Sequence, residues 1–275
     1  MIRLIAIDID GTLLDSHGHL PARNRAAIEQ VVARGVHVVL VTGRSFPFAV
    51  PVARQLPAPV SLIVSNGALE RSQDGTTLSS RLLPASEAVR ILSATPDYRH
   101  CAALIFDREA SGQIVADTMD WEVPNRKHYW LRNQHLIAQA SPLEQALTED
   151  PVEVMFNGGV GEMRDLAAHL TGLGDGFAVS VTEYEDRDFT LLDVTHPRAT
   201  KGQALAWRAG ELGLDRAEVM AIGDNLNDAE MLAFAGCPVL MANAAPSLRR
   251  PGWAVTTSQD DAGVADALHR FVLQA

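Results

Sequence analysis

The chain has 275 residues, enough for one large domain or for a core with a second domain inserted into it. Hydrophobic residues make up 47% of it, which excludes wholesale disorder, and the formal net charge of −11 disfavours non-specific binding to nucleic acid or anionic membranes. The two cysteines, Cys101 and Cys237, provide neither a zinc-motif spacing nor a disulfide framework.

The first predicted element is a buried strand that ends in carboxylates. Residues 4–8 form an apolar run that reaches Asp8, and Asp10 and a glycine turn at Gly11 follow. Side chains two residues apart in a strand share a face, so we expect Asp8 and Asp10 side by side at the carboxyl end of this strand. Two close carboxylates repel each other unless a cation or a shared proton intervenes. The pair therefore indicates a site for chemistry or for Mg²⁺.

Helical and strand patterns then alternate, as in a parallel α/β sheet. Residues 21–34 are typical of an amphipathic helix that ends at Gly35. Residues 36–41 and 60–64 are apolar runs typical of strands buried on both faces, and Asp74-Gly75 predicts a hairpin turn. We expect an α/β fold with a doubly wound, Rossmann-like parallel sheet.

The pattern changes between residues 84 and 188, where we predict an inserted α+β cap domain. In this part we expect strands over residues 102–106, 152–156 and 178–182, and helices over residues 86–94, 142–147 and 162–170. The core pattern then returns, with strands expected over residues 189–194, 218–222 and 239–241, and helices from residue 201, over 227–234 and over 263–272. The predicted domains are a core of residues 1–83 and 189–275, and a cap of residues 84–188.

Three further polar motifs fall at the ends of predicted core strands or at the helix starts that follow. They are Thr42-Gly43-Arg44, Thr200-Lys201-Gly202 and the run from Gly223 to Asp228, Gly-Asp-Asn-Leu-Asn-Asp. In an open parallel sheet the ligand crevice lies beyond the carboxyl ends of the strands, so these motifs can converge there. Each also has a simpler interpretation: a turn or helix cap for the threonine and the asparagines, and a solvated surface side chain for the lysine.

Taken together, the motifs Asp-x-Asp-Gly-Thr, Thr-Gly-Arg, Lys-Gly and Gly-Asp-Asn-x-Asn-Asp resemble those of the haloacid dehalogenase superfamily of phosphohydrolases. The long gap between Thr42 and Lys201, which holds the inserted domain, is similar to that of the Cof-type subfamily, whose members include many sugar-phosphate phosphatases. Asn66-Gly67-Ala68 and residues 241–244 and 260–265 also look like family segments.

The resemblance implies a mechanism and a set of site residues. Asp8 would attack phosphorus to form an aspartyl-phosphate, and Asp10 would act as general acid and then as general base. Mg²⁺ would be held by the Asp8 and Asp224 carboxylates and by the backbone carbonyl of Asp10. The implied phosphate-binding residues are Ile9, Thr42, Gly43, Lys201 and Asn227, and the implied supporting residues are Asp228, Arg44 and Asn66.

Some features depart from the family pattern or stay open. The family often has glycine where Ala242 stands and an acidic residue where Ala262 stands, which concerns the surroundings of the metal-site loop rather than the nucleophile. The cap stretch Arg126-Lys127-His128-Tyr129-Trp130 could grip a sugar or phosphate, although a surface segment with an aromatic side chain packed inward is the simpler interpretation. We take His196 to be structural.

The function expected from the resemblance is that of a Mg²⁺-dependent phosphatase of small phosphorylated metabolites, with sugar phosphates as the leading class. We expect no nucleic-acid or membrane partner and a monomer or small homo-oligomer. A cytoplasmic location is expected because Asp8 comes too early for a signal peptide and no apolar stretch approaches ~20 residues. A phosphomutase with the same intermediate is one alternative. A phosphoacceptor switch is another, although Asp10 and the inserted domain argue against it.

Overall fold

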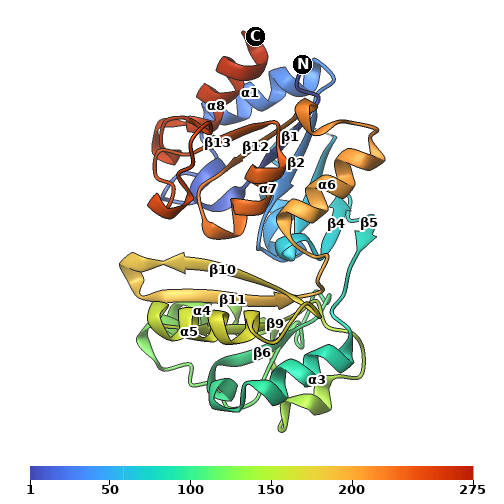
Figure 1. The fold of residues 1–275 in the computed structure, drawn as a ribbon, viewed down its shortest axis with the longest axis vertical. Helices are drawn as coiled ribbons and strands as arrows, with labels where there is room; N and C mark the ends of the chain where they lie inside the picture. Colours follow the sequence, from blue (N-terminus) through green and yellow to red (C-terminus); the bar gives the residue numbers. More distant parts are fainter. Residues whose placement is uncertain (58, 275) are drawn as a thin grey trace. The chain divides into compact units, whose positions relative to one another are not determined.

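The structure, a computed structural model, describes residues 1–57 and 59–274 and divides into two compact units. The first, the core unit, comprises residues 1–80 and 200–275, and the second, the inserted unit, comprises residues 81–199. Figure 1 draws the core unit in blue to cyan and orange to red, and the inserted unit in green to yellow. The chain thus leaves the core unit once and returns to it.

The core unit is built on an eight-stranded sheet with the strand order β14-β13-β12-β1-β2-β3-β4-β5. Its strands are β1 (Leu4–Ile7), β2 (His37–Val41), β3 (Val60–Val64), β4 (Leu69–Ser72), β5 (Thr77–Ser80), β12 (Val219–Gly223), β13 (Cys237–Leu240) and β14 (Ala254–Val255). The strands from β14 to β3 are parallel, and β4 and β5 are added antiparallel. This confirms the predicted parallel core and the hairpin at Asp74-Gly75.

Helices cover both faces of this sheet (Figure 1). They are α1 (Ala22–Ala33), α2 (Phe46–Ala53), α6 (Lys201–Glu211), α7 (Ala229–Phe234) and α8 (Gly263–Leu268). Successive strand residues point to opposite faces, and Leu4 and Ala6 of β1 belong to one apolar cluster with residues of α6 and α7. On the other side α1 packs against α8 and contacts β2. Burial on both faces explains why β1, β2 and β3 are almost continuously apolar.

The register of the sheet aligns the carboxyl ends of its central strands. Ile7 lies opposite Ile222 of β12 and Leu40 of β2, and Leu40 in turn lies opposite Leu62 of β3. The residues that follow these positions therefore leave the sheet at one edge.

The inserted unit has its own six-stranded sheet, in the order β10-β11-β9-β6-β7-β8, with three helices. The elements are β6 (Ala102–Ile105), β7 (Ile114–Ala116), β8 (Ile137–Gln139), β9 (Glu153–Gly158), β10 (Ala178–Tyr184), β11 (Phe189–Thr195), α3 (Ala85–Ala94), α4 (Pro124–Asn133) and α5 (Val160–Thr171). Leu92 of α3 and Leu166 of α5 share one apolar core with Phe156 of β9. Arg126 and Tyr129 of helix α4 contact Asn157 and Met155 of β9, which alternate with Phe156 along the strand. Helix α4 therefore covers the face of this sheet opposite to α3 and α5.

The structure corrects the predicted end of the inserted domain. We expected residues 189–194 to begin the returning core, but β11 pairs antiparallel with both β9 and β10. The inserted unit therefore extends to Ala199 and begins at Arg81 rather than at residue 84. An apolar strand has the same appearance in either sheet, and its pairing partners decide where it belongs.

Several smaller elements also differ from the prediction. Helix α2 was not predicted because Pro47 and Pro51 interrupt its pattern, and α4 was treated as a surface segment. The helix expected over residues 142–147 is a single 3₁₀ turn, Leu143–Ala146. The short strands β7, β8 and β14 carry too few residues for a recognisable alternation.

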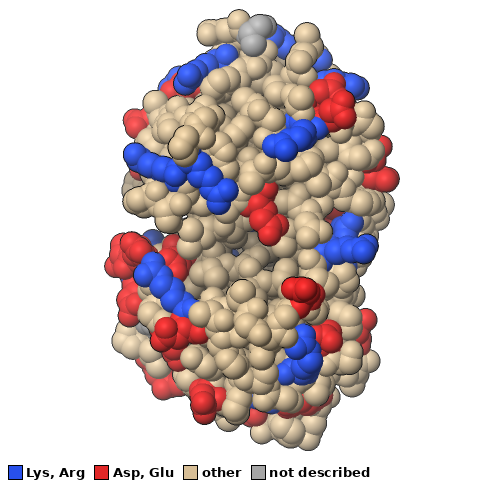
Figure 2. All heavy atoms as spheres, in the orientation of Figure 1, with Lys and Arg blue, Asp and Glu red and all other residues tan. Residues whose placement is uncertain are grey.

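The charged side chains on one face of the molecule are mixed in sign. On the face shown in Figure 2, acidic and basic side chains are interspersed instead of being separated by sign. Within the part of the chain that the structure describes, none of the helices has both the length and the apolar character that a membrane crossing requires.

The sheet of the inserted unit buries two carboxylates close together. Glu153 of β9 is 6% exposed, and Asp193 of β11, also 6% exposed, lies diagonally across the strand pair from it. Burial raises the pKa of Glu153 well above its usual range, and the charge of Asp193 raises it further. A carboxyl group whose pKa is raised in this way costs stability when it is ionised.

Exchanging Glu153→Gln should therefore stabilise the protein at neutral pH, on the order of 1 kcal/mol in the free energy of unfolding. Because the folded state binds the Glu153 proton more tightly than the unfolded chain does, wild-type stability falls as the pH rises above about 4.5, the ordinary value. The advantage of the variant should grow with pH over that range, in urea denaturation at several pH values. The exposed Glu109→Gln is the matched control, and a glutamine variant no more stable than wild type at neutral pH contradicts the prediction.

Candidate functional site

The candidate site lies where the central strands of the core sheet end. Asp8 follows β1, Thr42 follows β2, and Asn66 lies in the turn after β3. Asp224 follows β12, the neighbour of β1 on its other side. Lys201 is the first residue of α6, in the segment where the chain returns from the inserted unit.

A buried lysine joins two of the predicted carboxylates. The Lys201 Nζ donates to Asp8 Oδ1 and to Asp228 Oδ1, each at 2.6 Å. Lys201 is 2% exposed, Asp8 is buried, and Asp228 has no exposed surface. The surface interpretation of Lys201 is therefore wrong. The chain has only two lysines, and one of them is enclosed here.

The electrostatics of this cluster follow from burial and from an excess of carboxylates. Burial raises the pKa of Asp8 well above its usual value; Lys201 acts in the opposite direction, and Asp228 and Asp224 add to the increase. Burial, followed by Asp228, raises the pKa of Asp224 to about 7. Burial alone lowers the pKa of Lys201, but Asp228 and Asp8 outweigh it, so that pKa is raised and the lysine stays charged.

Asp224 lies directly against the loop after β1. A side chain on Gly11 would place its Cβ 2.3 Å from Asp224 Oδ2, and Gly11 has a φ of +82°, so glycine is required there on both grounds. The Thr12 hydroxyl donates to Asp224 Oδ1 at 2.8 Å. Thr12 is a site residue that the sequence analysis left out, although it stands within the quoted Asp-x-Asp-Gly-Thr motif.

Asp228 shapes the loop that carries Asp224. Its Oδ2 accepts the backbone N–H groups of Asp224 at 2.9 Å and Asn225 at 3.0 Å, while Oδ1 faces Lys201. Asn225 caps the following turn through the N–H of Leu226, as the simpler interpretation expected. Asp228 thus positions both the loop and the lysine.

The start of α6 is fixed by two contacts that the sequence analysis did not assign. The Thr200 hydroxyl caps the helix by accepting the Gln203 N–H at 3.1 Å, and it donates to Glu230. Gly202 allows a close approach, because a Cβ there would lie 2.5 Å from the Cβ of Glu230 on α7. These contacts set the direction in which Lys201 leaves the helix.

Asp10 does not lie where the strand alternation predicted. Strand β1 ends at Ile7, so neither Asp8 nor Asp10 belongs to it and the alternation of side chains along a strand does not apply to them. The carboxylates close to Asp8 are instead those of Asp224 and Asp228. The Asp10 carboxylate is partly exposed and receives two hydrogen bonds from Arg44, Nε at 2.7 Å and Nη2 at 2.5 Å. Arg44 therefore contacts the second motif carboxylate.

The other predicted phosphate-binding residues form a second group. The Thr42 hydroxyl accepts the Arg44 N–H at 3.1 Å, which is the turn that the simpler interpretation described. The Asn227 Nδ2 donates to Asn66 Oδ1 at 3.0 Å, and a Cβ on Gly43 would lie 3.2 Å from the same oxygen. Gly43, Asn66 and Asn227 are thus brought together from three strand ends. Ile9 is buried in the loop after β1.

The carboxy-terminal segment supports the loop after β1. The Asn243 side chain donates to Gly11 O at 2.8 Å and accepts the Gln259 N–H at 3.0 Å, and Asp260 Oδ1 accepts the Ser16 N–H at 2.8 Å. Ala262, one of the two departures from the family pattern, has a φ of +60°, where a Cβ is strained.

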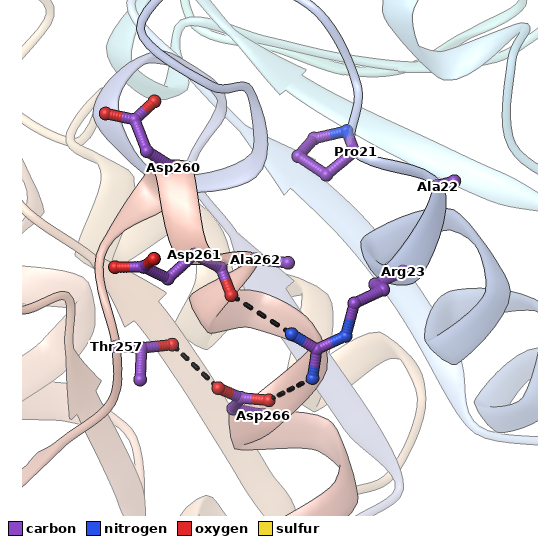
Figure 3. Close-up of a pocket in the computed structure, with 8 residues that line it drawn as sticks. All are labelled: Pro21, Ala22, Arg23, Thr257, Asp260, Asp261, Ala262 and Asp266. Carbon is purple, nitrogen blue, oxygen red and sulfur yellow. Dashed lines mark hydrogen bonds and ion pairs between the residues drawn. The ribbon is translucent and has the colours of Figure 1, made fainter.

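A pocket of about 510 Å³ is lined by residues of this segment and by the start of α1 (Figure 3). Arg23 of α1 spans it and donates to the Asp261 carbonyl and to Asp266, which also accepts the Thr257 hydroxyl. Because Arg23, Asp266 and Thr257 already pair with one another, we do not assign a ligand to this pocket.

In the inserted unit, the stretch from Arg126 to Trp130 lies on α4. Arg126 is buried and donates to the carbonyl of Asn157, and Tyr129 stacks on Trp121 at 6.4 Å between ring centroids. The prediction that an aromatic side chain of this stretch packs inward is confirmed for Tyr129, and the basic side chain of Arg126 is buried as well. The His196 Nδ1 accepts the Arg198 N–H, a local structural contact.

The carboxylate cluster fits a divalent cation. Oxygens of Asp8, Asp224 and Asp228 lie within 4.8 Å of one another, and one lysine cannot balance three carboxylates. All the donors are hard oxygen atoms, which suit Mg²⁺.

Comparison with known proteins agrees with this geometry. A family model described as haloacid dehalogenase-like hydrolase matches residues 5–268. The HMP-PP phosphatase of Serratia proteamaculans is 32% identical, and the match covers 90% of this chain and 87% of that protein. Phosphatase YwpJ of Bacillus subtilis is 28% identical, and the match covers 98% of this chain and 100% of that protein. The solved subclass IIB sugar phosphatase BT4131 is 20% identical over 98% of each chain with a TM-score of 0.75, a similarity of fold.

Removing the buried lysine should destabilise the core unit strongly. Lys201→Met leaves Asp8 and Asp228 without their shared partner, and breaking a buried pair costs about 3–5 kcal/mol. Urea denaturation at neutral pH measures the loss. Lys127→Met, at the other lysine and in an exposed ion pair with Glu122, is the matched control. Equal losses in the two variants would show that the buried cluster is not held by Lys201.

Proposed function

Because the chain belongs to the haloacid dehalogenase-like hydrolase family, and relatives such as the two named above are phosphatases, we propose that it is a Mg²⁺-dependent phosphatase of small phosphorylated metabolites. The observation that carries this proposal is the cluster of Asp8, Asp224 and Asp228 around Lys201 at the ends of neighbouring parallel strands. It combines a nucleophile, hard metal ligands and a fixed cation in one place.

The metal ligands in this proposal are the Asp8 and Asp224 carboxylates and the backbone carbonyl of Asp10. When bound, the ion supplies positive charge that offsets the carboxylates and the transferring phosphoryl group. Asp228 takes part indirectly, since its oxygens are engaged with Lys201 and with backbone N–H groups.

Asp8 is the proposed nucleophile. A carboxylate oxygen of Asp8 forms a bond to phosphorus while the bond from phosphorus to the leaving oxygen breaks, and the leaving oxygen takes a proton from Asp10. Water then attacks the aspartyl-phosphate, gives a proton to Asp10 and releases inorganic phosphate and free Asp8. The reaction needs Asp8 ionised, and Lys201 favours that form against the effect of burial.

Arg44 adds a condition to the role of Asp10. Both Asp10 oxygens accept hydrogen bonds from the Arg44 guanidinium, whereas an oxygen that exchanges a proton with the leaving group must face that group. We infer that Asp10 leaves Arg44 when substrate binds, which would free Arg44 to contact the phosphate or the leaving group.

The phosphoryl oxygens are assigned to donors at three strand ends and at α6. These are the hydroxyl of Thr42, the amide of Asn227, the Lys201 ammonium, and the backbone N–H groups of Ile9 and Gly43. Charge spread over the equatorial oxygens is best stabilised by donors fixed beforehand, and the Asn66–Asn227 hydrogen bond fixes one of them.

Sugar phosphates are the proposed substrate class, with a cytoplasmic location. The named relatives act on small molecules or bear phosphatase names, and one fold neighbour is called a sugar phosphatase. The net charge of −11 speaks against polyanionic partners such as nucleic acid.

Asp8→Asn should lower phosphate release from a panel of phosphorylated metabolites at least ~10³-fold, because the amide is a poor nucleophile. Release by wild type should require Mg²⁺ and stop with excess chelator. The exposed Asp175→Asn of the inserted unit is the control and should keep full activity. Near-wild-type turnover by the Asp8 variant would rule out the nucleophile. Isomerised sugar phosphate in place of free phosphate would identify a phosphomutase, and a lasting phospho-Asp8 without turnover a phosphoacceptor switch.

Asp10→Asn should leave Mg²⁺ binding nearly unchanged, since the backbone carbonyl remains, but should slow turnover ~10²-fold or more. Calorimetric Mg²⁺ titration alongside steady-state kinetics separates the two effects. Loss of Mg²⁺ affinity with normal turnover at saturating metal would reassign Asp10 as a carboxylate ligand.

A further inference from the structure

The inserted unit carries a second group of metal-ligating side chains. His100 and Cys101 end the 3₁₀ segment Pro96–Cys101, just before β6, and Glu162 lies in the first turn of α5. A ring nitrogen of His100, the Sγ of Cys101 and a carboxylate oxygen of Glu162 all lie within 4.8 Å of one another. All three belong to the inserted unit, whereas the carboxylate–lysine cluster belongs to the core unit.

The hydrogen bonds of His100 leave one nitrogen facing an acceptor. Its Nδ1 lies 3.0 Å from the carbonyl oxygen of Asp97, which can only accept, so Nδ1 carries a proton. Its Nε2 lies 3.3 Å from Glu162 Oε1. With the proton on Nδ1, Nε2 is an acceptor like the carboxylate oxygen, and a metal ion between the two atoms would be bound by both. A histidine that donates one N–H to a backbone carbonyl and offers the other nitrogen is the usual arrangement of a metal ligand.

The spacing of these atoms agrees with tetrahedral coordination. With metal–nitrogen and metal–oxygen bonds of about 2.0–2.2 Å, two ligands of a tetrahedral ion are about 3.3 Å apart. The His100 to Glu162 separation matches that edge. The Cys101 Sγ lies within 4.8 Å of a His100 ring nitrogen and of a Glu162 oxygen. Its thiol donates to the Tyr98 carbonyl, and this proton is released when the sulfur binds a metal ion.

The backbone is shaped to admit the Glu162 carboxylate. A Cβ on Gly158, the last residue of β9, would lie 2.5 Å from Glu162 Oε2. Any side chain at residue 158 would therefore push the carboxylate away from His100 and Cys101. Half of the His100 side chain is exposed, so a water molecule can reach the fourth corner.

We propose that His100, Cys101 and Glu162 bind a zinc-class transition-metal ion, with water as the fourth ligand. One nitrogen, one sulfur and one oxygen donor select a borderline-soft ion such as Zn²⁺, whereas the all-oxygen cluster of the core unit selects Mg²⁺. Without a metal, burial and then Glu162 raise the pKa of the Cys101 thiol to about 12, so Cys101 is protonated and unreactive. The ion would tie the segment before β6 to α5 and so stabilise the inserted unit.

Cobalt(II) is the probe that separates this site from the core cluster. Metal-free protein is titrated with Co²⁺ in the presence of excess Mg²⁺, which occupies hard-oxygen sites, and thiolate-to-cobalt charge transfer is followed in the near ultraviolet. Wild type and the control Cys237→Ser should show the band at one equivalent. Cys101→Ser should lose it, and Zn²⁺ should abolish it in wild type by displacement.

Substitutions at the exposed His100 and the half-buried Glu162 keep the test decisive if the cysteine variant folds poorly. His100→Ala and Glu162→Gln should each weaken Co²⁺ binding at least ~10-fold while phosphate release with Mg²⁺ stays at the wild-type level. Zn²⁺ should raise the melting temperature of wild type but not of His100→Ala. The proposed site is overturned if wild type shows no thiolate band. It is also overturned if Cys237→Ser loses the band while Cys101→Ser keeps it. A band that neither of these two substitutions affects leaves His100 and Glu162 as an ordinary ion pair and equally overturns the site.

Discussion

The core unit depends on one enclosed ammonium group. Lys201 binds Asp8 and Asp228 at equal distances, and it lies 193 positions after Asp8 in the chain. Both parts of the core unit, before and after the insertion, therefore meet at this contact. Its desolvation cost is offset only if the partners are held in place, which explains the surrounding constraints: Gly11 admits Asp224, and Thr200 directs the start of α6. A substitution at Gly11 or Thr200 would therefore displace a charged group of the cluster, Asp224 in the first case and Lys201 in the second.

Much of this site could be predicted because parallel strands end at one edge. The position of Asp8 and Asp224 after apolar runs was enough to bring them together, since β1 and β12 are neighbours with aligned ends. Lys201 was harder to assign. A lysine in the first turn of a helix is unfavourable by itself, and only the presence of two carboxylates makes its burial reasonable.

The failures have a common cause, which is that pairing over long distances leaves no local signal. Strand β11 resembles a core strand in composition, yet its neighbours are β9 and β10 of the inserted sheet. The expected pairing of Asp8 with Asp10 assumed that the strand continued, whereas the chain leaves the sheet after Ile7. Arg44, the residue that holds Asp10, comes from the end of a different strand. Strand alternation describes a residue correctly only while the strand lasts.

The charge balance of the core cluster also constrains the order of events in the proposed reaction. Asp8, Asp224 and Asp228 face one lysine, and a phosphate monoester adds up to two negative charges. In a buried site such an excess is very unfavourable, and burial together with the neighbouring carboxylates already raises the pKa values of Asp8 and Asp224. Either protons or a divalent cation must enter with or before the substrate. Protons would neutralise the very carboxylate that has to attack phosphorus, whereas a cation leaves it ionised. In the proposed reaction, the charge arrangement that requires an ionised Asp8 as nucleophile therefore also requires a metal ion for substrate binding.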